Sequence, residues 1–67
     1  MSIDIRKNII KNFKGASTND IINSIAESLV QKEEITLPGL GVFFEILWNN
    51  SDESFKKIMV ENIQKGL

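Results

Sequence analysis

The sequence predicts an all-α fold, a small bundle of about four helices formed by one domain that spans residues 1–67. Three observations lead to this prediction. Apolar residues recur at helical spacing in several segments, small polar residues that favour helix N-caps precede them, and only one proline occurs among the 67 residues. A chain of this length buries a modest core, so we expect either very efficient packing or a second copy of the chain.

The first helix is expected directly after the N-terminus. Ser2 is its predicted cap, and Gly15 is placed to end it. Its apolar positions are Ile3, Ile5, Ile9, Ile10 and Phe13. Three lysines, Lys7, Lys11 and Lys14, fall on the opposite face.

The second helix has the clearest periodic pattern in the chain. Ser17, followed by Asp20 three residues later, resembles a capping box, and the helix should run to about Gln31 or Lys32. Its repeating apolar residues are Ile21, Ile22, Ile25, Ala26, Leu29 and Val30. This spacing predicts a regular amphipathic helix.

The segment from Leu37 to Trp48, called the hub below, is the one that the other helices are expected to cover. Its structural residues are Leu37, Pro38, Gly39, Leu40, Gly41, Phe43, Phe44, Ile46, Leu47 and Trp48. Proline fixes φ and glycine adds backbone freedom, so residues 37–41 predict a tight Pro-Gly-Leu-Gly turn. The apolar run after the turn would spread around most of a helix, which predicts a buried third helix. An α+β alternative stays open, with a hairpin at about residues 34–48.

The last helix is expected after a polar break at residues 49–51, with Asp52 and Glu53 in its first turn, where acids complement the helix dipole. Its inner stripe consists of Phe55, Ile58, Met59 and Ile63, with Leu67 as a further candidate. Gly66 is expected to close it.

One charged residue falls on an apolar face. Arg6 lies within the apolar arc of the first helix, where a guanidinium must reach water along its stem or meet a carboxylate. Glu45 is the only acid within the hub. We therefore consider a buried ion pair between Arg6 and Glu45; the alternative is a surface arginine at the rim of the core.

The composition argues against catalysis. Cysteine and histidine are both absent, which removes the commonest general base and the usual soft metal ligands. We expect no enzyme activity, no catalytic, cofactor-binding or metal site, and no small-molecule substrate. No apolar run reaches about 18 residues, and the N-terminal residues do not form a basic segment followed by an apolar core and a cleavage site, so we expect an intracellular protein that does not bind membranes.

DNA is a weaker candidate partner. Lys7, Lys11 and Lys14 share a helix face and could contact phosphates, although a net charge of −1 argues against a protein that coats nucleic acid by charge alone. The pattern from the second helix into the hub also loosely resembles the histone-like HU proteins. That resemblance stops at Ile46, because no basic arm follows Trp48.

Residues 33–50, Glu-Glu-Ile-Thr-Leu-Pro-Gly-Leu-Gly-Val-Phe-Phe-Glu-Ile-Leu-Trp-Asn-Asn, resemble the signature of the small acid-soluble spore protein I family of endospore-forming bacteria. The similarity covers nearly the whole chain, including Arg6 and the end near Gly66. It implies a protein of the forespore and spore core with no assigned enzymatic activity. The glycine-rich signatures of the DNA-coating α/β-type spore proteins are absent, so the shared name does not imply DNA binding.

We therefore expect a non-enzymatic spore protein that acts as a small structural or interaction module. Its core, very apolar for a chain of this length, predicts self-association as a homodimer. The alternative is a DNA-associated spore-core protein that contacts phosphates through its basic first helix.

Overall fold

The computed structural model describes residues 4–67, and the described part is helical without any strand. It contains α1 (Ile5–Phe13), α2 (Thr18–Gln31), the short 3-10 helix η1 (Glu34–Thr36), α3 (Leu37–Asn49) and α4 (Glu53–Lys65). The all-α prediction is confirmed. The alternative hairpin at residues 34–48 is wrong, because η1 and α3 occupy this segment and satisfy its backbone hydrogen bonds within helices.

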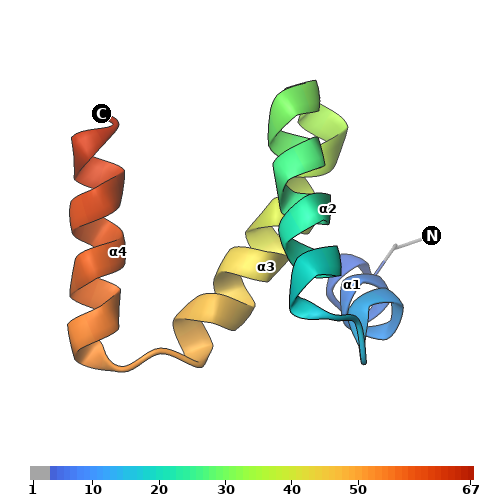
Figure 1. Ribbon diagram of the computed structural model, residues 1–67, viewed down its shortest axis with the longest axis horizontal. Coiled ribbons are helices and arrows are strands. Elements are labelled where there is room, and N and C mark those ends of the chain that lie inside the picture. Colours follow the sequence, from blue (N-terminus) through green and yellow to red (C-terminus); the bar gives the residue numbers. More distant parts are fainter. Residues whose placement is uncertain (1–3) are drawn as a thin grey trace.

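The helix α3 is the centre of the arrangement, since both α1 and α2 pack against it (Figure 1). From this contact α3 slopes away to a short link, and α4 follows as a separate arm on the other side of the molecule (Figure 1). The longest dimension is 35 Å and the radius of gyration is 13.1 Å. A compact domain of this length has a radius of gyration of about 11 Å, so the single chain is open.

The helix α1 begins after Asp4. The Asp4 carboxylate accepts a hydrogen bond from the backbone N–H of Lys7 at 3.0 Å, which caps the helix. Ser2, the predicted cap, lies outside the described residues. Gly15 has φ +82° just past the helix, so it ends α1 as predicted, through a left-handed conformation that glycine adopts at no steric cost.

The prediction for α2 is confirmed at both ends. The Ser17 hydroxyl accepts a hydrogen bond from the backbone N–H of Asp20 at 3.1 Å. The helix ends at Gln31, and Lys32 follows in the left-handed region with φ 52°.

The turn predicted for residues 37–41 is wrong, because this segment is the first part of α3. Pro38 occupies the first turn of the helix, where backbone N–H groups have no intrahelical partner and the fixed φ of proline suits the helix. The bend in the chain comes earlier, at η1, where the Thr36 hydroxyl donates to the Glu33 carbonyl at 2.8 Å. Gly39 and Gly41 both have ordinary negative φ.

The link between α3 and α4 divides its polar residues between the two helices. Asp52 is the N-cap of α4 and accepts from the Phe55 N–H at 2.8 Å. The side chains of Asn50 and Ser51 donate instead to carbonyls in the last turn of α3. Each helix end is therefore satisfied locally, and α4 needs no contact with the other helices to begin.

Within residues 4–67, no helix has both the length and the apolar character needed to cross a membrane.

Candidate functional site

One side of the hub packs against α1. The rings of Phe13 and Phe43 meet edge to face, with centroids 5.0 Å apart and an interplanar angle of 74°. Gly39 lies so close to α1 that a Cβ atom there would contact the Ile9 Cδ1 atom at 3.4 Å. Val42, between these two contacts in sequence, is 8% exposed and is the only buried apolar residue of the described part. This side is the core of the single chain.

The rest of the hub is open, so the prediction of a buried third helix needs correction. Phe44 is 43% exposed, and the other exposed large apolar hub residues are Leu37, Ile46 and Leu47. Leu40 and Trp48 are half-buried, whereas Pro38 and Gly41 are exposed. A helix that is apolar on nearly all sides needs neighbours on all sides, and α1 and α2 cover only part of it. Within one chain, α3 is therefore half core and half surface.

Trp48 connects the hub to α4. Its ring lies 5.9 Å from the Phe44 ring on the preceding turn of α3. The Lys56 ammonium of α4 lies 5.0 Å from the indole centroid, within the range of a cation–π interaction. Lys56 also pairs with Glu53 at 3.6 Å. The sequence holds no signal for the Trp48–Lys56 contact, because it depends on the angle between two helices.

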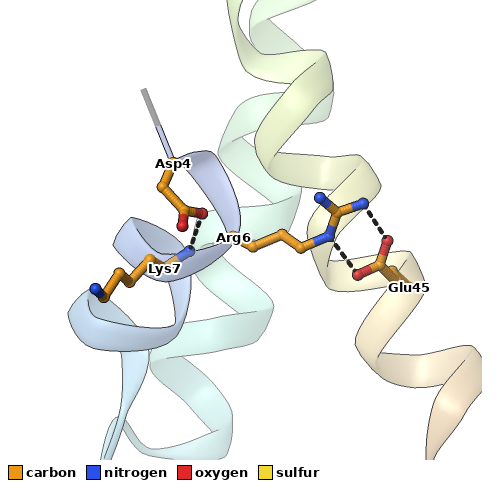
Figure 2. Close-up of polar contacts among 4 residues, drawn as sticks. All are labelled: Asp4, Arg6, Lys7 and Glu45. Atoms are coloured by element: carbon orange, nitrogen blue, oxygen red, sulfur yellow. Dashed lines mark hydrogen bonds and ion pairs between the residues drawn. The ribbon is translucent and has the colours of Figure 1, made fainter. Parts of the chain in front are cut away.

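The structure brings Arg6 and Glu45 together, as Figure 2 shows. Arg6 Nε donates to Glu45 Oε1 at 2.7 Å and Nη2 donates to Oε2 at 2.8 Å, so the guanidinium and the carboxylate meet in a two-pronged arrangement. These hydrogen bonds lower the pKa of Glu45 and raise the pKa of Arg6 from their ordinary values. The side chains are 68% and 43% exposed, so the pair is not buried. It joins α1 to α3 at the rim of their contact.

The three predicted lysines are all exposed, but only Lys7 and Lys11 lie on α1; Lys14 is the C-cap after the helix and has an extended backbone. Within residues 4–67, neither Lys7, Lys11 nor Lys14 is in an ion pair with an acidic side chain. The backbone N–H of Lys7 is used in the helix cap by Asp4, while its ammonium extends away from the cap (Figure 2). These lysines stand apart from the apolar surface of the hub.

The apolar stripe predicted as the inner face of α4 is also largely exposed. Phe55 is 46%, Ile58 52% and Ile63 48% exposed, and only Met59 is half-buried. The other helices leave this stripe uncovered because α4 stands apart from them (Figure 1). Leu67, the further candidate, follows the end of α4 at Lys65 and is 97% exposed, so it does not belong to the stripe. The other four members were predicted correctly, but their inward orientation within one chain is wrong. We refer to these four residues below as the α4 stripe.

Groups suited to metal binding are not brought together in the part of the chain that the structure describes: no cluster of three or more acidic, histidine or cysteine side chains occurs in residues 4–67. The features that stand out are instead two apolar surfaces, one on α3 and one on α4. Such surfaces bind other apolar surfaces.

Comparisons with known proteins agree along the whole chain. The sequence model of the family described as "Small, acid-soluble spore protein I" matches residues 3–67. A small, acid-soluble spore protein I from Bacillus cereus (strain G9842) is 39% identical over 67 residues, which covers 100% of this chain and 97% of the relative. The protein of the same name from Bacillus cereus (strain AH187) is 37% identical with the same coverage. No solved structure matches the chain.

Proposed function

Because the chain belongs to the small, acid-soluble spore protein I family, we propose that this sporulation protein is a non-enzymatic module of the forespore and spore core that binds a second copy of itself. Homodimer formation covers the apolar surfaces that the single chain leaves open. The protein then acts through its assembled surface rather than through a reacting group.

The observation that carries this proposal is the mismatch between apolar content and burial. Of all residues, 42% are hydrophobic, yet Val42 is the only buried apolar residue within residues 4–67. Eight large apolar side chains on α3 and α4 are between a third and two thirds exposed. Monomeric proteins rarely leave large apolar patches in water, and the usual use of such patches is contact with another protein.

Light scattering coupled to size exclusion tests self-association directly. We expect a mass of twice the 7.6 kDa chain mass at high concentration, with dissociation on dilution that follows mass action. A mass that stays at 7.6 kDa over the whole accessible concentration range would contradict the proposal. Imaging a fluorescent fusion during sporulation tests the forespore localisation separately, and signal in the mother cell would contradict that part.

A second candidate function is DNA contact through α1. The observation in its favour is that Lys7 and Lys11 on α1, and Lys14 at its C-cap, are exposed and have no acidic partner in the described part. Neutralising three phosphates gives a slope of about −2.7 in a plot of log affinity against log salt. Fluorescence anisotropy with a labelled duplex measures this slope.

The matched pair of variants for the DNA test has the same charge change in two places. Lys7→Glu with Lys11→Glu removes the basic face of α1, whereas Lys57→Glu with Lys65→Glu changes α4 by the same net charge. Binding that is lost only in the first pair supports DNA contact through α1. Absence of binding at low salt, or equal loss in both pairs, contradicts it.

A further inference from the structure

We propose that the second copy is bound through α4, so that two α4 helices pack antiparallel with Met59 of each chain at the two-fold axis. This inference rests on the self-association proposed above and adds the surface and the orientation. The partner is a second copy of this chain, and the contact surface is the α4 stripe.

The α4 stripe has no covering helix among residues 4–67 of its own chain. Phe55, Ile58 and Ile63 are each about half exposed and Met59 is half-buried, although α4 is thirteen residues long and has a cap at both ends. The arm stands clear of α1 and α2 (Figure 1). Its contact with the hub, Lys56 over Trp48, involves a neighbouring side of the helix and leaves Phe55 and Ile58 open.

The stripe matches itself when one copy is reversed. Phe55 precedes Met59 by four residues and Ile63 follows it by four, so these three residues form one ridge along the helix. In an antiparallel pair centred on Met59, each Phe55 lies opposite Ile63 of the other copy. Ridges of this type pack into each other in the commonest class of helix contact, at a crossing angle of about −50°. The same patch is used by both copies, as a two-fold dimer requires.

The helix dipoles favour the reversed orientation. Glu53, in the first turn of α4, is already paired with Lys56 of the same helix at 3.6 Å. Both Glu53 and Lys65 lie about 120° around the helix from Met59, so their charges do not face the contact. An antiparallel pair places the positive N-terminal end of each α4 dipole beside the negative C-terminal end of the other, whereas a parallel pair would place like dipole ends together.

The amount of surface that the single chain exposes also favours a dimer. The accessible surface is 5870 Å², whereas a folded monomer of this mass exposes about 4,300 Å². The difference of roughly 1,600 Å² exceeds the ~800 Å² per partner that a typical stable interface buries. The open shape of the whole chain therefore leaves enough surplus surface for a stable dimer, and the α4 stripe is one part of that surface.

Disulfide trapping tests the arrangement, because the chain has no cysteine of its own. We expect Met59→Cys to form a covalent dimer under mild oxidation, whereas Gln64→Cys, on the opposite face of α4, links at least tenfold more slowly. An equal mixture of Phe55→Cys and Ile63→Cys should give mainly mixed dimers, which mass spectrometry identifies. Self-linked Phe55→Cys dimers as the main product would indicate a parallel pair and overturn the proposal.

A charge at the axis gives a second readout that does not depend on oxidation. Met59→Lys should weaken the dimer at least tenfold in light scattering, and the matched Gln64→Lys should leave it unchanged; far-UV circular dichroism checks that both stay helical. If the chain is dimeric but Met59 and Gln64 variants behave alike, the α4 contact is wrong while self-association stands. If the unmodified chain is monomeric at all concentrations, both proposals fail.

Discussion

Replacing Gly41 with alanine should stabilise the protein, although the sequence suggests a glycine-dependent turn at this position. Gly41 lies inside α3 with an ordinary negative φ, and a Cβ atom added there meets no heavy atom within 4 Å. The change therefore has no steric cost. Alanine is better than glycine inside a helix by about 0.8–1.0 kcal/mol, mainly because the unfolded chain loses freedom.

Gly15→Ala is the matched control, since it is the same chemical change at φ +82°. There the added methyl group meets no neighbour, but a left-handed backbone costs an L-residue about 1–2 kcal/mol. Gly41→Ala should raise the melting temperature by about 4–8 °C, and Gly15→Ala should lower it by a similar or larger amount. The two variants thus differ only in backbone conformation.

Urea denaturation followed by far-UV circular dichroism measures both changes, at one fixed protein concentration because dimer formation shifts the apparent stability. The denaturant slope should not change in either variant. If Gly41→Ala destabilised the protein as much as Gly15→Ala, a helical conformation at Gly41 would be refuted. The result would instead support the predicted turn at residues 37–41.

Three further predictions concern other contacts of the same helices. A double-mutant cycle with Phe13→Leu and Phe43→Leu should give a coupling of about 0.5–1.5 kcal/mol from urea midpoints, as an edge-to-face pair requires; additive effects would show that the rings do not interact. Because the pKa of Glu45 is lowered by Arg6, the ion pair stabilises the fold above the ordinary glutamate pKa, and this contribution is lost as the pH falls through the lowered value. Stability of Glu45→Gln should therefore decline less on acidification than that of the parent, and identical pH profiles would contradict the pairing. Asp52→Ala should weaken α4 by about 1 kcal/mol in hydrogen exchange, whereas Asp52→Asn, which can still cap, should change it little; equal protection in both would exclude the cap.

Features that depend on a few neighbouring residues could be predicted from the sequence. The Ser17 cap, the extent of α2 and the end of α1 at Gly15 each follow from local chemistry. The start of α3 could not be predicted, because the proline and glycines there are compatible with both a tight turn and a helix. Pro38 is compatible with both a turn and a first helical turn, and only the helix that continues after it decides between them.

Features that depend on distant parts of the chain were predicted only in outline. The pairing of Arg6 with Glu45 could be predicted because each is the charged residue within an apolar pattern. The exposure of the pair could not, because it depends on how far the contact between α1 and α3 extends. In the same way, the membership of the α4 stripe follows from helical spacing, whereas its lack of cover depends on the direction that the chain takes after Asn49. Amphipathic periodicity identifies the face of a helix that needs a partner, but not whether the partner belongs to the same molecule.

The contact between Trp48 and Lys56 gives the protein a built-in optical reporter. Trp48 is the only tryptophan and the chain has no tyrosine, so nearly all intrinsic fluorescence originates where α3 contacts α4. The indole has the Lys56 ammonium and the Phe44 ring as neighbours, and both the polarity around it and its quenching change if the angle between α3 and α4 changes. Fluorescence of the unlabelled protein therefore follows the bend between α3 and α4, and titrating the concentration shows whether assembly alters that bend.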